Sequence, residues 1–154
     1  MKTYRGLFAG TVMGVLLYIV IFNLFHPFVV SGPSMEPTFH DENLVLSTDK
    51  FTKESLSYGD IVVAFMDGKR VIKRIVALPG DNVLIEDGIL YVNGEPSEYN
   101  FAPIDNAGML SEGTSLSSDE FILLGDNRNN SLDSRDYGPA QIDEIKYLVT
   151  KKLF

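Results

Sequence analysis

Two residues far apart in the chain have the types needed for serine-dependent cleavage of an acyl bond. Ser34 lies in the stretch Ser-Gly-Pro-Ser-Met-Glu-Pro-Thr at 31–38, where two prolines and a glycine prevent a continuous helix or a central strand. Such a backbone can hold one hydroxyl in a fixed orientation, and a serine becomes a nucleophile when a neighbouring base accepts its proton. Taken alone, the stretch more readily indicates an ordinary turn, so the assignment depends on a base elsewhere.

Lys73 is the candidate base. Side chains alternate along a strand, so Lys73 shares one face with Val71, Ile75 and Ala77 and is the only charged residue of these four. A lysine on an apolar face either extends its amine to water or an ion pair, or is buried with a lowered pKa. The adjacent Arg74 fits an ion pair better, because guanidinium keeps its proton in proteins. A neutral Lys73 amine near Ser34 would act as a general base, which predicts a Ser-Lys dyad.

The polar segment 125–138 contains two Asp-x-Arg units, Asp126/Arg128 and Asp133/Arg135. On one extended face the members of each unit could pair with each other or cross-pair, and so fix the loop. A calcium loop is the rival interpretation, but arginines occupy would-be ligand positions and the terminal Glu of an EF-hand is absent. We expect a rigid scaffold beside an active site.

Composition restricts the classes of function. The chain of 154 residues has 21 acids and 13 bases, and no basic stripe follows the first few residues, which argues against a nucleic-acid partner. The absence of cysteine excludes disulfides, thiolate metal sites and a cysteine nucleophile. The only histidines, His26 and His40, are too few for a histidine-rich metal site. We therefore expect neither a metal nor an organic cofactor.

Residues 6–25 form an uncharged, largely apolar run that follows Lys2 and Arg5 and ends at His26-Pro27. Roughly 20 helical residues at about 1.5 Å each span the hydrocarbon core of a bilayer. Cleavable signal peptides have a shorter apolar core, about 7–15 residues, and then a small-residue site. Residues 22–30 are too bulky for such a site. The segment therefore predicts an uncleaved transmembrane signal anchor.

The bases ahead of this anchor place its N-terminal side in the cytoplasm. The sequence thus predicts a cytoplasmic N-terminus at 1–5, the anchor at 6–26 and one extracytoplasmic domain at 27–154, in the cell membrane by a single pass. The domain has an ordinary size for a single core, and we expect a monomer whose partners include the lipid bilayer.

Short strands and turns dominate the domain. Apolar runs predict strands at 43–46, 61–66, 69–78, 82–86, 89–93, 121–124 and 147–154. Asp67-Gly68 and Asp87-Gly88 are typical hairpin turns. Many short strands with frequent turns predict a mostly β domain of barrel-like or sandwiched antiparallel sheets.

Four segments in one order resemble the bacterial type I signal peptidases, in a minimal form of the Gram-positive kind. The segments are the serine box at 32–38, Tyr-Gly-Asp-Ile-Val-Val at 58–63, the lysine box at 73–81, and the polar box at 125–135. They span nearly the whole chain, after one N-terminal anchor. The endoplasmic-reticulum branch of the family has a histidine where this chain has Lys73.

The resemblance implies a membrane-anchored serine endopeptidase of signal-peptidase-like β-fold that removes signal peptides from exported preproteins. By this resemblance Ser34 is the nucleophile, Lys73 the general base, and Ser131 the hydroxyl that helps to orient the lysine amine. Asp133 and Arg135 match the structural pair behind the site.

The resemblance also implies an extended substrate, with small residues in the Ala-x-Ala pattern one and three positions before the cut. Met35 and Ile72 are candidate walls of the first pocket. Gly32 stands where some members of the family have a serine, so a side-chain oxyanion donor is missing there and the backbone N–H of Ser34 is the expected donor.

Three alternatives compete with this interpretation. A Ser-His-Asp site would need His26 or His40, and the Ser-x-x-Lys pattern at 47–50 matches penicillin-binding enzymes, although their Lys-Thr-Gly box is absent. The alternative of another class is a catalytically silent membrane-anchored β-domain that acts as a scaffold or adaptor. The presence of both Ser34 and Lys73 argues against that alternative.

Overall fold

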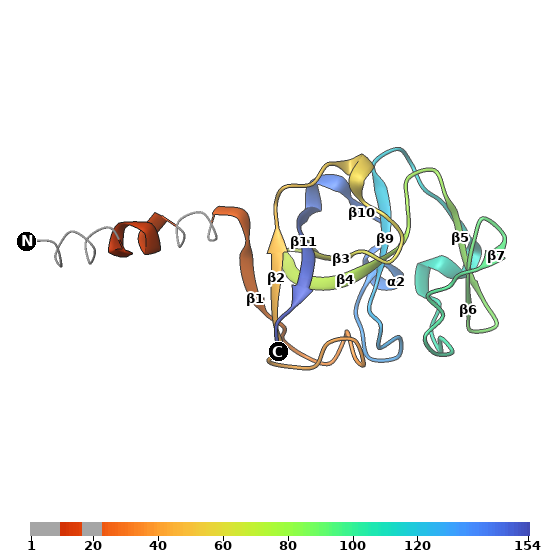
Figure 1. Ribbon diagram of the computed structural model, residues 1–154. Coiled ribbons are helices and arrows are strands. Elements are labelled where there is room, and N and C mark those ends of the chain that lie inside the picture. Colours follow the sequence, from red (N-terminus) through yellow and green to blue (C-terminus); the bar gives the residue numbers. More distant parts are fainter. Residues whose placement is uncertain (1–9, 17–22) are drawn as a thin grey trace, which may run out of the picture.

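The computed structural model describes residues 10–16 and 23–154 (Figure 1). Residues 10–16 are helical. Within the described part of the chain, no helix has the length and apolar character needed to cross a membrane. The anchor expected at 6–26 includes residues 6–9 and 17–22, which lie outside the described residues, so it stays a prediction.

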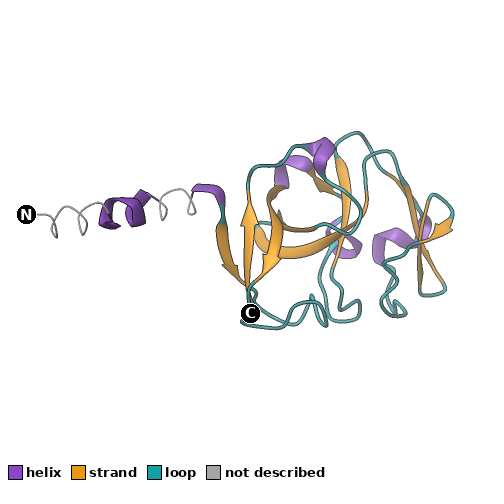
Figure 2. Ribbon diagram, viewed as in Figure 1, coloured by secondary structure: helices purple, strands orange, loops and turns teal. Residues whose placement is uncertain are grey.

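The larger of two sheets has seven antiparallel strands in the order β1-β2-β11-β3-β4-β9-β10 (Figure 2). Their bounds are β1 His26–Val29, β2 Leu44–Thr48, β11 Ile145–Lys152, β3 Ile61–Met66, β4 Lys69–Ala77, β9 Glu120–Leu124 and β10 Ala140–Gln141. The expectation of a mostly β, antiparallel domain is confirmed. The barrel-like closure is wrong, because β1 pairs only with β2 and β10 only with β9, which leaves the sheet open in the described residues.

The smaller sheet has four strands in the order β7-β6-β5-β8, with β7 at Glu95–Pro96, β6 at Ile89–Val92, β5 at Asn82–Glu86 and β8 at Thr114–Ser115. The expected Asp-Gly turn joins β5 to β6, with φ of 50° at Asp87 and 77° at Gly88. Two successive positive φ angles match the twist of paired strands, which explains the pairing of Asp or Asn with Gly at such turns. The Asp67-Gly68 turn between β3 and β4 has the same geometry.

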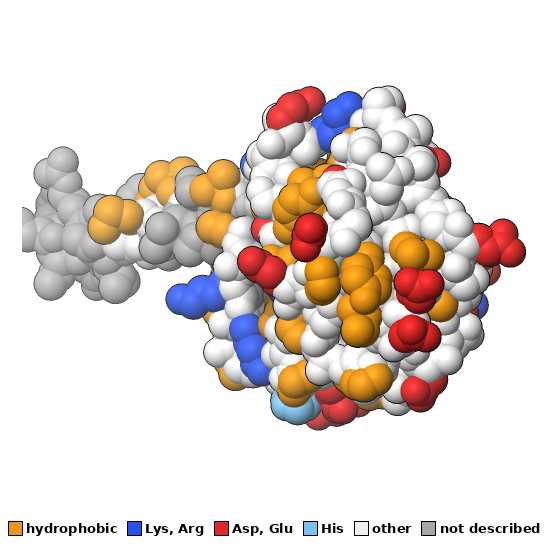
Figure 3. All heavy atoms as spheres, turned by 90° about the vertical axis from the view of Figure 1, so that its right-hand side faces the viewer, with side chains coloured by type: hydrophobic (Ala, Val, Ile, Leu, Met, Phe, Trp, Pro, Cys, Tyr) orange, Lys and Arg blue, Asp and Glu red, His pale blue; other side chains and the backbone are white. Residues whose placement is uncertain are grey.

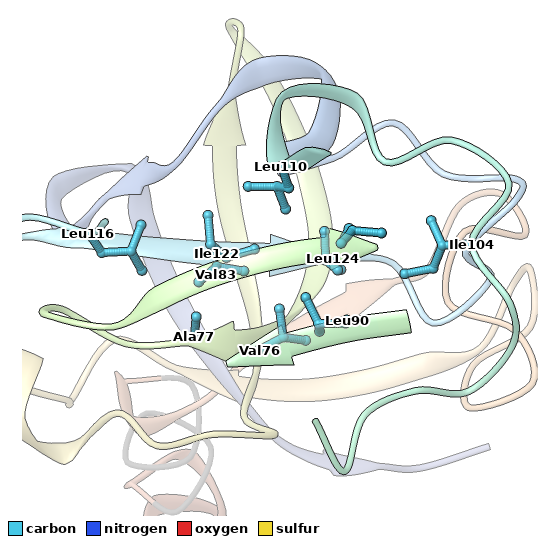
Figure 4. Close-up of a cluster of buried hydrophobic side chains, with 10 residues drawn as sticks. Val76, Ala77, Val83, Leu90, Ile104, Leu110, Leu116, Ile122 and Leu124 are labelled. Atoms are coloured by element: carbon cyan, nitrogen blue, oxygen red, sulfur yellow. The ribbon is translucent and has the colours of Figure 1, made fainter. Parts of the chain in front are cut away.

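A shared core joins the two sheets (Figure 4). Val76 and Ala77 of β4 and Leu124 of β9 meet Val83 and Leu90 of the smaller sheet. All five are at most 1% exposed. The smaller sheet is therefore packed against β9 and against the end of β4 that follows Lys73, and it supports the position of both strands.

The remaining elements are short helices: η1 Lys53–Ser55, η2 Gly108–Glu112, α2 Ser134–Tyr137 and η3 Ile142–Glu144. α2 lies inside the segment that the sequence predicts as a polar loop. It begins there because the Asp133 carboxylate accepts a hydrogen bond from the backbone N–H of Arg135, and Asp136 completes a capping box.

On the end of the molecule that carries the smaller sheet, apolar and acidic side chains share the surface (Figure 3).

Candidate active site

Ser34 is held by a turn between β1 and β2. The flanking Val30 and Met35 are 3% and 0% exposed and anchor the turn in the core. From the polar box, the backbone N–H of Asn127 donates to the carbonyl oxygen of Ser34 at 3.1 Å, and its side-chain amide donates to the carbonyl of Pro33 at 3.2 Å. The serine is therefore fixed by two segments that are about 90 residues apart in sequence.

Lys73 reaches Ser34 from β4. Its side chain is 3% exposed, and the Nζ atom lies 3.0 Å from Ser34 Oγ and 3.0 Å from the carbonyl oxygen of Ile72. Burial is the largest effect on the Lys73 amine and lowers its pKa. The carboxylate of Asp133 raises this pKa, the guanidinium of Arg135 lowers it further, and the carboxylate of Asp126 raises it. When the amine is neutral, the hydroxyl of Ser34 can donate its proton along the same contact.

Arg74 and Asp126 connect the strand of the lysine to the turn of the serine. Arg74 Nε and Nη2 donate to the two carboxylate oxygens of Asp126 at 2.8 and 2.6 Å, and the hydroxyl of Thr38 donates to the same carboxylate at 2.5 Å. Arg74 also donates to the carbonyl oxygen of Gly59 at 2.7 Å. This network fixes β4, the serine turn and the polar box relative to one another.

Asp133 and Arg135 form a buried ion pair, with distances of 2.8 and 2.9 Å between the guanidinium nitrogens and the carboxylate oxygens. The second oxygen of Asp133 also accepts the backbone N–H of Gly125 at 3.0 Å. A Cβ atom at Gly125 would lie 2.2 Å from Ser131 Oγ and 2.5 Å from the carbonyl oxygen of Ser34. The pair therefore holds a close backbone approach that only glycine permits.

The Asp126/Arg128 unit does not pair internally. Asp126 pairs with Arg74, whose guanidinium reaches across from β4, while Arg128 is 1% exposed and donates to the carbonyl oxygen of Tyr99 at 2.6 Å. The Nε and Nη1 atoms of Arg128 have no hydrogen-bond partner among the described residues. Burial lowers the pKa of Arg128 to about 10, although Asp133 and Asp126 oppose the shift.

Ser131 Oγ is buried and has no hydrogen-bond partner among the described residues. The Lys73 amine bonds to Ser34 and to the carbonyl of Ile72 instead. Ser131 and Lys73 nevertheless line one hollow, so the hydroxyl is near the amine without a bond between them.

Two hollows border the dyad. The first, of about 180 Å³, is lined by Phe28, Val29, Ser31, Ser34, Val63, Arg70, Val71, Ile72 and Lys73. The second is lined by Ser34, Lys69, Val71, Lys73, residues 129–132 and Tyr137. Ile72 thus lines the first hollow, whereas Met35 is fully buried behind it in the cluster against which Ile72 packs.

The rival nucleophiles and bases lie elsewhere. His26 lies 3.7 Å from Asp49, His40 lies 3.4 Å from Glu36, and neither histidine lines a hollow beside Ser34. Ser47 is fully buried, and its hydroxyl donates to the carbonyl oxygen of His26 at 2.8 Å. The alternatives based on these residues therefore lack the geometry that they require.

Comparison with known proteins identifies the family of the chain. The family model described as signal peptidase, peptidase S26, matches residues 4–150. The chain belongs to this family. It is 36% identical over 151 residues to a signal peptidase I of Bacillus licheniformis, covering 90% of this chain and 80% of that one. It is 34% identical over 137 residues to a signal peptidase I of Bacillus amyloliquefaciens, covering 81% and 74%.

A crystal structure of a signal peptidase I from Enterococcus faecalis is 26% identical, with a TM-score of 0.49, and covers 62% of this chain and 97% of that one. Family membership makes the protein a peptidase of the S26 class, a hydrolase that processes signal peptides.

Sequence reasoning missed two supports of the site. It treated Arg74 only as a cation suited to an ion pair and did not assign it to Asp126, and it gave no role to Thr38. The order of the residues contains a partial signal, because Arg74 follows Lys73 directly and must point to the opposite side of β4. The identity of the partner depends on the folded arrangement of segments distant in sequence.

Proposed function

We propose that the protein is a membrane-anchored serine endopeptidase that cleaves signal peptides from exported preproteins, with Ser34 as nucleophile and Lys73 as general base. The observation that carries this proposal is the distance of 3.0 Å between Lys73 Nζ and Ser34 Oγ, with the lysine buried and its pKa lowered. Family membership supplies the reaction class.

In this mechanism Ser34 Oγ attacks the scissile carbonyl carbon while the neutral amine of Lys73 accepts the hydroxyl proton. The C–N bond then breaks, the lysine returns the proton to the leaving amine, and an acyl-enzyme remains. Water hydrolyses this ester by the same proton transfer. The backbone N–H of Ser34 donates to no acceptor among the described residues, so it is free to stabilise the developing oxyanion.

The supporting residues have separate tasks in this proposal. The Asp133–Arg135 pair positions the polar box, and through Gly125 it sets the approach of Ser131 to the dyad. The hydroxyl of Ser131, which lacks another partner in the described chain, would hold the lysine amine when Ser34 is acylated and no longer bonds to it.

The open edge of the larger sheet offers a place for the substrate. Among the described residues, 69–73 of β4 pair only with β3, since β9 joins β4 from Arg74 onward. Within the same part of the chain, β1, on the other wall of the first hollow, pairs only with β2. An extended signal peptide would enter as a strand between β1 and β4. The small hollow beside Ile72 suits the small side chains of an Ala-x-Ala site.

The proposal also places residues 6–26 in the membrane as a signal anchor, with residues 1–5 in the cytoplasm and the catalytic domain at 27–154 outside. The apolar run and the bases before it support this topology. The protein would act as a monomer. Protease added to intact spheroplasts should digest the domain but leave the first residues protected, and a fully protected domain would reverse the topology.

The deciding experiment is cleavage of a preprotein with an Ala-x-Ala site by the purified chain in detergent, with Ser34→Ala and Lys73→Ala alongside. We expect the wild type to cut after the second alanine, and both variants to be inactive with unchanged circular dichroism. An inactive wild type would favour the scaffold alternative. A Lys73→Ala variant that retains activity would remove the dyad from the mechanism.

A further inference from the structure

The outer end of the first hollow contains an unpaired cation. Arg70 lies on β4, exposed, and its guanidinium carbon is 5.1 Å from the centre of the Phe28 ring on β1. The Phe28 ring is itself supported by Tyr147, at 5.0 Å between ring centres. In the described part of the chain Arg70 pairs with no carboxylate, although the protein has an excess of acids. A cation–π contact therefore positions Arg70 across the hollow without neutralising it.

Direction and distance relate Arg70 to the substrate. From Phe28 to Ser34 and from Arg70 to Lys73, both walls of the hollow approach the dyad with increasing residue number. A peptide with its upstream residues in this hollow and its scissile bond at the dyad therefore runs parallel to both. Arg70 precedes Lys73 by three residues, or about 10 Å of strand. The backbone of Arg70 therefore lies beside the third or fourth substrate residue before the cut. Its long side chain extends beyond that residue, away from the dyad.

We infer that Arg70 is a specificity residue for the cleavage reaction, which favours preproteins with an acidic side chain four to six positions before the cut. This inference rests on the proposed function. The guanidinium offers several donors in a planar array that fits a carboxylate. A peptide entering between β1 and β4 must pass the contact between Arg70 and Phe28, so a carboxylate there gains a charged partner that is already oriented.

The neighbouring Lys69 provides a matched control. Lys69 precedes Arg70 on β4, so its side chain points to the other side, and it lines the second hollow rather than the first. Removing either residue changes the net charge equally. A preference that arises from overall electrostatic attraction would respond to both substitutions, whereas a local contact would respond only to the change at Arg70.

The test compares peptides with alanine one and three positions before the cut and either Glu or Gln at positions four, five or six before it. For the wild-type full chain in detergent micelles at low salt, we expect kcat/KM to favour Glu over Gln by about two- to fivefold at one or more positions, the range of an exposed ion pair. The ratio should approach one in Arg70→Ala, fall below one in Arg70→Glu, and persist in Lys69→Ala. Added salt should reduce it.

Three outcomes would overturn the inference. The Glu-to-Gln ratio could be the same in Arg70→Ala and wild type. It could also depend on Lys69 instead, which would place the upstream residues of the substrate in the second hollow rather than the first. An effect of Arg70→Ala that is equal for both peptides and appears only with anionic lipid vesicles would assign the cation to the membrane surface. Failure of the wild type to cut any of the peptides, whether they carry Glu or Gln, would instead refute the proposed function itself.

Discussion

Loss of the Asp126 carboxylate should both destabilise the protein and disorder the dyad. This carboxylate accepts two hydrogen bonds from Arg74 and one from Thr38, so it joins the strand of Lys73 to the turn of Ser34. Asp126→Ala would leave the Arg74 guanidinium without its anion in a nearly buried position.

The structure sets the expected size of the effect. The side chains of Arg74 and Asp126 are 12% and 0% exposed, and removal of one partner from a buried ion pair costs about 3–5 kcal/mol. Arg74 would keep its bond to the carbonyl of Gly59 and its contact with the ring of Phe101 at 5.2 Å. We therefore expect about 3 kcal/mol for Asp126→Ala, and about half of that for Asp126→Asn, which keeps one acceptor.

Urea unfolding of the full chain in detergent micelles, followed by circular dichroism, would measure these changes. A double-mutant cycle with Arg74→Met isolates the pair, and we expect a coupling of about 2 kcal/mol. Asp119→Ala is the control, because its ion pair with Lys53 is exposed and should contribute no measurable stability. A coupling below about 0.5 kcal/mol would refute the view that this network unites the two halves of the site.

Three further predictions concern the same region. The activity should rise with pH, with a midpoint below the pKa of about 10.4 of free lysine, because burial lowers the pKa of Lys73 and the neutral amine is the active form. A pH–rate profile with its midpoint near pH 6–7 would contradict a lysine base. Gly125→Ala should lower kcat by about 100-fold in a folded protein, because its Cβ would displace Ser131 and the Ser34 backbone, and near-normal single-turnover rates would contradict this. Arg128→Met should change the free energy of unfolding by less than about 1.5 kcal/mol, since two nitrogens of Arg128 lack partners among the described residues. Arg135→Met should cost about 3 kcal/mol, because it removes the partner of the buried Asp133 carboxylate. Equal losses of stability for the two variants in urea denaturation would contradict this difference.

Local patterns in the sequence were enough to locate most strands and turns. The alternation and the Asp-Gly pairs predicted the hairpin of β3 and β4 and that of β5 and β6 with bounds that agree within about a residue. These features are local, because side-chain period and the sterics of positive φ depend on neighbouring residues. The four-residue strand β1 and the two-residue strands β7, β8 and β10 were missed. Two residues carry no period, and β8 and β10 pair only where a distant strand provides an edge.

The sequence by itself identified Ser34 and Lys73 as a candidate pair, because one serine lies in a rigid turn and one lysine interrupts an apolar strand face. Only the tertiary structure decided that their reactive atoms lie 3.0 Å apart and that Asp126 pairs with Arg74 rather than Arg128. It also decided that the larger sheet stays open beside the dyad. Composition and spacing describe what each segment can do, whereas ion-pair partners and free edges depend on which segments the core brings together.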